Sequence, residues 1–186
     1  MKYPVLLPFF LLSGLLAGCA GTVVSQPSAP SGSGGIAAAP PTVKTGLSVA
    51  ATCADSKDGS AKTEVTMVAV TVDENGIIRS CIIDQLETAL DFDTTGALLT
   101  DPDTEFPTKN QLGSAYGMGA VSPIGREWDQ QAAALAEYVV GMTADQVAAI
   151  PVNEEGRPTG ADLMSSATIS ISPFLEGIVQ AVNNAE

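Results

Sequence analysis

Two β-rich runs separated by an Asn-Gly pair impose the strongest constraint on how this 186-residue chain can fold. Residues 62–72 alternate with period two, and residues 77–83 form a similar run after Asn75-Gly76. Asn-Gly is the strongest short-range signal for a two-residue hairpin turn, so the two runs are predicted to pair as antiparallel strands. Both alternating faces of residues 62–72 are apolar, which is typical of a central strand covered on both sides. The preceding apolar run, residues 47–52, is predicted to complete a three-stranded meander.

The middle of the chain gives weaker signals. Residues 91–109 are polar, and we expect one more short strand around residues 97–99. Residues 113–125 are rich in glycine but do not match the dinucleotide-binding pattern, which needs three spaced glycines between a strand and a helix. We expect these residues to form a loop, either near a ligand or at a tight packing site.

Helical spacing dominates the last third of the chain. One helix is expected to have Pro123 in its first turn and to stop at Gly141. Thr143 is predicted to cap a short helix that runs through Ile150, with the three-residue spacing of a capping box. A final helix is expected to open at Ser172-Pro173, with the serine as its cap and the proline in its first turn. The predicted fold class is therefore α+β, a small antiparallel sheet with helices packed on it.

The first residues have the pattern of an export signal. Lys2 is the only charge before a short apolar run, and small residues then lead into Cys19. The run is shorter than the roughly 20 apolar residues that a membrane-spanning helix needs. The sequence Leu-Ala-Gly-Cys resembles the bacterial lipobox, in which the cysteine is acylated and becomes the new N-terminus. We expect residues 1–18 to be a lipoprotein signal peptide and Cys19 to anchor the protein on the extracytoplasmic side of the cell membrane. The alternative is an ordinary secretory signal cut after Ala20.

Composition divides the rest of the chain into two parts. Residues 19–45 are rich in Ser, Pro, Gly and Ala, and cannot bury enough apolar surface to offset their ordering entropy. We expect them to form a lipidated flexible tether. Residues 46–186 have the size of one ordinary domain and are sufficient for a core without disulfides.

Charge and residue usage exclude several classes of function. The chain has 8 basic and 21 acidic residues; the leader removes only Lys2, which leaves 7 basic residues and a net charge of −14. There is no basic cluster, which argues against nucleic acid as a partner. The chain contains no histidine, which excludes serine-hydrolase triads and histidine-based zinc sites. Cys53 and Cys81, which remain after lipidation of Cys19, are too few for a thiolate metal cage. We expect no metal site and no catalytic residue.

Cys53 and Cys81 are expected to be free thiols, although export permits a disulfide. If Asn75-Gly76 forms the turn, Cys81 lies opposite Val70 in the middle of its ladder. Cys53 then lies near the far end of the preceding hairpin, one strand further over. A bridge needs Cα atoms within ~7 Å of each other, so this placement favours two unpaired thiols.

One segment before the last helix carries a chemical motif. It reads Asp162-Leu163-Met164-Ser165-Ser166-Ala167-Thr168. This segment resembles the flavinylation motif of the FMN-binding domain family, which includes the flavin-carrying subunits of the Rnf and Nqr redox pumps and extracellular flavin lipoproteins. The family motif reads acidic residue, two variable positions, Ser or Thr, Gly or another small residue, Ala, Thr. Here the matching positions are Asp162, Ser165, Ser166, Ala167 and Thr168. Ser166 stands where glycine is usual, and because its Cβ disfavours positive φ, the turn geometry or the fit to the modifying enzyme is expected to be altered.

The resemblance extends loosely over residues 45–185. It includes Glu87-Thr88, since a Glu-Thr pair follows a strand in the family, and a motif that leads into a C-terminal amphipathic helix. It implies that an extracytoplasmic flavin transferase, using FAD and a metal, joins FMN to the Thr168 oxygen as a phosphoester. Arg157 is the nearest cation in sequence that would screen the phosphate, although a solvated loop charge is the plainer interpretation.

The function implied is that of a lipid-anchored electron carrier rather than a stand-alone enzyme, with the flavin performing the redox chemistry. The alternative is a cell-surface binding or structural lipoprotein that keeps the FMN-binding-like fold without the cofactor. For the motif itself, the alternative is a strand of alternating Ile and Ser that ends at Ser172.

Overall fold

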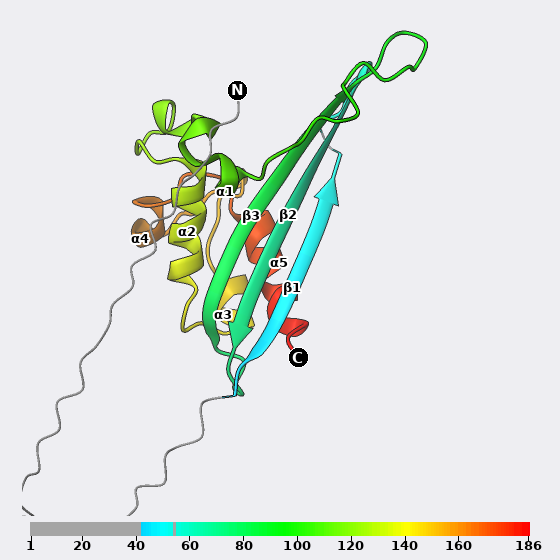
Figure 1. Ribbon diagram of the computed structural model, residues 1–186. Coiled ribbons are helices and arrows are strands. Elements are labelled where there is room, and N and C mark those ends of the chain that lie inside the picture. Colours follow the sequence, from blue (N-terminus) through cyan, green and yellow to red (C-terminus); the bar gives the residue numbers. More distant parts are fainter. Residues whose placement is uncertain (1–41, 54) are drawn as a thin grey trace, which may run out of the picture. The chain divides into compact units, whose positions relative to one another are not determined.

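The computed structural model describes residues 42–53 and 55–186 (Figure 1). The predicted signal peptide, the lipidation site Cys19 and most of the predicted tether lie outside the described residues. The strands are β1 (Lys44–Thr52), β2 (Ser60–Val72) and β3 (Ile78–Asp91). They form one antiparallel sheet in the order β1-β2-β3, so the predicted meander is confirmed and β2 is its central strand.

The turn between β2 and β3 is one residue longer than the predicted two-residue hairpin. The Gly76 N–H donates to the Asp73 carbonyl at 3.0 Å, and the Asp73 carboxylate accepts from the N–H groups of Asn75 and Ile77 at 2.9 and 3.0 Å. Only Gly76 has a positive φ, of 72°, and Asn75 does not. This is the pattern of a three-residue loop that ends in a left-handed glycine, which hairpins also use. A register shift next to Val72 absorbs the extra residue.

Only one face of the sheet is covered. Val68, Val70 and Val72 of β2 are fully buried, and the helices lie on their side of the sheet (Figure 1). On the opposite face Leu47 and Val49 of β1 are each 58% exposed. The prediction that β2 is covered on both sides is therefore wrong. Apolar β-branched residues on both faces indicate a strand, because such residues favour strands, but they do not indicate whether helices or a second sheet cover the outer face.

The helical elements follow the strands, as predicted, but they outnumber the three helices that the sequence predicts. They are α1 (Lys109–Leu112), the 3-10 turns η1 (Gly113–Tyr116) and η2 (Met118–Ala120), α2 (Trp128–Tyr138), α3 (Ala144–Ala148), α4 (Ala161–Met164) and α5 (Ser172–Asn183). None of the helices within the described residues is long and apolar enough to cross a bilayer.

Several boundaries differ from the predictions. α2 begins at Trp128, well after Pro123, and the region predicted to be a glycine-rich loop contains the two 3-10 turns. The expected strand near residue 98 is reduced to one bridge between Phe92 and Leu98. Thr143 caps α3 through a capping box with Gln146, as predicted.

The last helix lies directly against the sheet because two glycines allow it. A Cβ at Gly46 of β1 would overlap the Ala181 carbonyl of α5, and a Cβ at Gly177 would lie 2.8 Å from a methyl group of Val68. The residues after α5 also cover part of the β1 edge, where backbone hydrogen bonds of 3.3 and 3.4 Å join Thr45 and Glu186. Small residues at these positions therefore set the distance between helix and sheet.

Candidate functional site

The residues of the motif form a short helix and the turn after it. Asp162 lies in the first turn of α4, and the Ser165 hydroxyl donates to the Asp162 carbonyl at 2.8 Å. The Ala167 N–H donates to the Leu163 carbonyl at 2.8 Å, which continues the helical turn. The alternative of an Ile-Ser strand ending at Ser172 is therefore wrong. Serine hydroxyls that bond back to carbonyls three or four residues earlier favour such a turn over a strand.

Ser166 fits the turn without backbone strain. No residue other than glycine has a positive φ in the described part of the chain, so position 166 does not need glycine for its conformation. The Ser166 hydroxyl lies 3.3 Å from the Leu163 carbonyl and 3.4 Å from the Asp162 carbonyl. Ser166 is therefore accommodated without strain, and its effect on the turn relative to the family and on the fit to a modifying enzyme stays a prediction.

Thr168 is held in place by Gln131, a residue of α2. The Thr168 N–H donates to Gln131 Oε1 at 2.8 Å, and the Thr168 hydroxyl donates to the same oxygen at 3.2 Å. Ala167 is fully buried, whereas Thr168 is only half-buried. The motif thus places Ala167 in the core, while Thr168 is partly exposed.

Gln131 joins the motif to the segment before α2. Its side chain has no exposed surface. Its amide nitrogen donates to the Arg126 carbonyl at 2.9 Å and to the Ser122 hydroxyl at 3.2 Å, and it lies 3.6 Å from Met118 Sδ. Sequence reasoning missed this residue, although a signal existed: a glutamine three residues after Trp128 lies on the apolar stripe of a helix, where a buried polar group needs a partner.

The charges around this site are mixed. Arg126 is exposed and forms no ion pair with any described residue. Glu127 and Asp129, in the same segment, each have a buried carboxylate oxygen without a hydrogen-bond partner in the described part of the chain. Arg157, predicted as the nearest cation, is exposed and pairs with Glu155 at 3.2 Å, which supports its interpretation as a solvated loop charge. Electrostatics alone would therefore hold a phosphate weakly here.

A second polar cluster is centred on Lys109 of α1. Glu64 and Glu87 lie opposite each other on β2 and β3. Lys109 Nζ, almost fully buried, lies 2.5 Å from Glu87 Oε1 and from Gln85 Oε1, and 3.7 Å from Glu64 Oε2. The same ammonium lies 5.1 and 5.4 Å from the ring centroids of Tyr116 and Trp128. This lysine was also missed, because nothing in its local sequence indicates burial.

The cluster shifts the pKa values of its carboxylates in opposite directions. Burial raises the pKa of Glu64, which the more distant charge of Lys109 offsets only in part. Burial also acts to raise the pKa of Glu87, but the hydrogen bond and the charge of Lys109 lower it overall. The pKa of Lys109 is raised because, although burial lowers it, contacts with Glu87 and Tyr116 more than compensate. Glu87 and Lys109 therefore form a charged pair at neutral pH.

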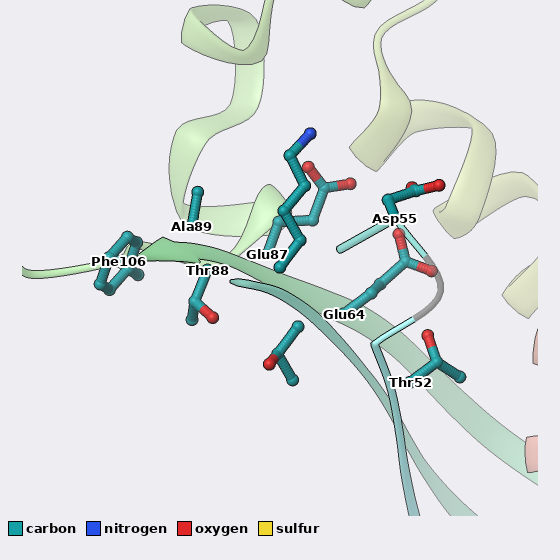
Figure 2. Close-up of a pocket in the computed structure, with 9 residues that line it drawn as sticks. Thr52, Asp55, Glu64, Glu87, Thr88, Ala89 and Phe106 are labelled. Carbon is teal, nitrogen blue, oxygen red and sulfur yellow. The ribbon is translucent and has the colours of Figure 1, made fainter. Parts of the chain in front are cut away.

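A cavity of about 320 Å³ lies beside this cluster (Figure 2). Figure 2 shows Asp55, Glu64 and Glu87 pointing to the same side of the strands. Glu87-Thr88, the pair on which the resemblance to the FMN-binding family partly rests, lies in its wall, but it belongs to β3 and does not follow a strand as predicted. The lining residues are Thr52, Asp55, Lys62, Thr63, Glu64, Glu87, Thr88, Ala89 and Phe106. Among the described residues, no group of three or more Asp, Glu or Cys side chains could hold a metal ion.

The two polar clusters meet at α2. Trp128 lies beside Lys109, and Gln131, one turn later on the same helix, holds Thr168. Comparison with known proteins adds no relative: no family model, no curated protein and no solved structure matches this chain.

Proposed function

We propose that this chain is a membrane-anchored extracytoplasmic flavoprotein that carries FMN as a phosphoester on Thr168 and transfers electrons. The observation that supports this proposal most is the setting of the Thr168 hydroxyl. Thr168 is partly buried at the end of the motif, and both its hydroxyl and its backbone N–H donate to the same Gln131 oxygen. An acceptor hydroxyl must be ordered and reachable; the two hydrogen bonds supply order, and the partial exposure of the residue is compatible with access.

The residues around Thr168 are compatible with a bulky group on its oxygen. Ser165 and Ser166 turn their hydroxyls back toward carbonyls of α4, and Ala167 points into the core. All three side chains are small. When bound, FMN would supply the electron-transfer chemistry, and the chain would supply its attachment and position.

A covalent bond also suits the local charge. Glu127 and Asp129 lie within four residues of Gln131, and the chain as a whole has a net charge of −13. The exposed Arg126, whose carbonyl bonds to Gln131, forms no ion pair with any described residue. A phosphoester keeps the flavin attached even though the surrounding potential is unfavourable.

The decisive experiment is coexpression with an extracytoplasmic flavin transferase, followed by intact-protein mass spectrometry. We expect the wild-type protein to gain one FMN and to show flavin absorbance, and Thr168→Val to gain none. Valine keeps the shape and β-branching of threonine and removes only the nucleophile, so its melting temperature checks the fold. Thr168→Ser keeps a hydroxyl and should retain partial loading. A wild-type protein that stays unmodified beside a flavinylated control protein would reject Thr168 as the acceptor.

A cell-surface binding lipoprotein without cofactor is the second candidate. It is favoured by the uncovered face of the sheet, where Leu47, Val49 and Ile82 are 58%, 58% and 64% exposed. Contiguous exposed apolar surface of this kind often marks an interaction site. An unmodified wild-type protein in the coexpression experiment would make this candidate the better one.

A further inference from the structure

We propose that Gln131 is the positioning residue for flavin attachment, orienting the Thr168 hydroxyl so that its oxygen faces the modifying enzyme. This inference rests on the proposed function of Thr168. Gln131 lies 37 residues before the acceptor and outside the motif, and its contact with Thr168 arises only because α2 packs beside the turn after α4.

The Gln131 amide is fully buried, and its hydrogen bonds explain why a polar side chain occupies this position. The position lies between Trp128 and Ala132 on the buried face of α2, where an aliphatic residue would avoid the desolvation of an amide. Instead, both ends of the amide are used: the oxygen accepts twice from Thr168, and the nitrogen donates to Arg126 and Ser122. The amide is thus a fully bonded bridge between the motif and the segment before α2.

Two backbone groups fix which way the amide faces. The Arg126 carbonyl can only accept, so it must meet the amide nitrogen. The Thr168 N–H can only donate, so it must meet the amide oxygen. The Thr168 hydroxyl, which also meets this oxygen, must therefore donate its own proton to it. Its proton then points toward the buried Gln131 amide, and its lone pairs are left for bond formation.

This orientation matches what the transfer requires. The Thr168 oxygen forms a bond to the phosphorus of the FMN half of FAD, the bond from that phosphorus to the bridging pyrophosphate oxygen breaks, and AMP leaves with that oxygen. The hydroxyl proton passes to a base on the transferase or to solvent, and no electron is exchanged. After the transfer the hydroxyl hydrogen bond is gone, but the Thr168 N–H still bonds to Gln131, so the turn keeps its anchor.

Three variants test this role. Gln131→Leu keeps the approximate size and removes both contacts to Thr168. Gln131→Glu keeps acceptor oxygens for Thr168 and, when protonated, a donor for the Arg126 carbonyl. Ser122→Ala is the matched control, because it removes one partner of the amide nitrogen and leaves the contacts to Thr168 intact. Each is coexpressed or incubated with the flavin transferase and FAD. The readouts are the initial rate of FMN loading by mass spectrometry, hydrogen exchange of the Thr168 amide before loading, and the melting temperature.

We expect Gln131→Leu to load at least ~10-fold more slowly than wild type, since a lost hydrogen bond of ordinary strength corresponds to about one order of magnitude. Its Thr168 amide should exchange faster at a temperature where the protein is still folded. Gln131→Glu should load faster than Gln131→Leu, and more so as the pH falls and the carboxyl becomes protonated. Ser122→Ala should load at close to the wild-type rate.

The outcomes separate this inference from the proposal on which it rests. If the wild-type protein is loaded with FMN and a folded Gln131→Leu variant is loaded equally fast, the positioning role of Gln131 is overturned, but the proposed function of Thr168 is not. Wild type that is never loaded overturns both. If Gln131→Leu does not fold, Gln131→Glu decides: loading that is unchanged from wild type at every pH overturns the role, and loading that falls as the carboxyl ionises supports it.

Discussion

At the scale of single residues, each of the two polar clusters is centred on a buried polar side chain, where an apolar side chain would fill the core equally well. Gln131 and Lys109 are both nearly inaccessible, and each has hydrogen-bond or charge partners on other elements. A buried polar group stabilises a fold only when its partners are present. Both residues are therefore expected to tolerate substitution poorly, in contrast with Arg157, whose ion pair is exposed and contributes little.

The two cysteines within the described residues should differ sharply in reactivity. Cys53 is exposed, and Cys81 lies opposite Val70 on the covered face of the sheet. The predicted absence of a disulfide between them is confirmed. Burial raises the pKa of the Cys81 thiol to about 12, so almost no thiolate exists at neutral or mildly alkaline pH. A thiol reagent should label Cys53 in the native protein and Cys81 only after denaturation, as peptide mass spectrometry would show. Rapid native labelling at Cys81 in Cys53→Ser would contradict this burial.

At the scale of elements, local signals identified most of the fold. Asn75-Gly76 indicated the hairpin, and Thr143 indicated the start of α3, because turn type and helix capping depend on only a few neighbouring residues. Two features required the tertiary structure. The open outer face could not be read from the apolar alternation of β2, and the contact of Gln131 with Thr168 depends on how α2 and α4 pack. The motif was found from sequence, but the residue that holds its threonine was not.

The packing of α5 on β1 gives a prediction at this scale. Gly46→Ala should lower the free energy of unfolding by ~1–3 kcal/mol, the usual cost of overpacking. The new Cβ would overlap the Ala181 carbonyl, which is backbone and cannot rotate away. Gly160→Ala is the matched control, because a Cβ there meets no atom within 4 Å, and its effect should stay within ~0.5 kcal/mol.

Urea unfolding monitored by circular dichroism measures both glycine variants. Equal midpoints for Gly46→Ala and Gly160→Ala would mean that α5 can move away from the sheet without cost. The helix–sheet spacing described above would then not be set by Gly46.

At the scale of the whole domain, α2 connects the turn that carries Thr168 with the Lys109 cluster and with α5. Its first residue, Trp128, packs edge-on against Phe174 of α5 at 5.8 Å between ring centroids and lies beside Lys109. Its fourth residue, Gln131, holds the turn with Thr168. The helix is fixed to the core through Ala132 and Leu135, which are fully buried. The turn that carries Thr168 is therefore held by a helix that is fixed in the core, and in the proposed function the movement of the flavin between partners comes from outside the domain.

In the proposed function that movement comes from the segment before the domain, and the lipid anchor predicted for this segment gives the last prediction. Cys19→Ser should release the protein from membranes, because Cys19 is the predicted acylation site and each acyl chain contributes ~0.8 kcal/mol per buried methylene. Cys53→Ser is the matched control: it also replaces a cysteine, but in the folded domain, and should leave the protein on the membrane. Detergent phase partitioning and membrane fractionation measure both variants. Release should leave FMN loading at Thr168 unchanged, since the acceptor turn lies within the folded domain. If Cys19→Ser stays with the membrane as firmly as Cys53→Ser, the protein is held there by something other than acylation of Cys19.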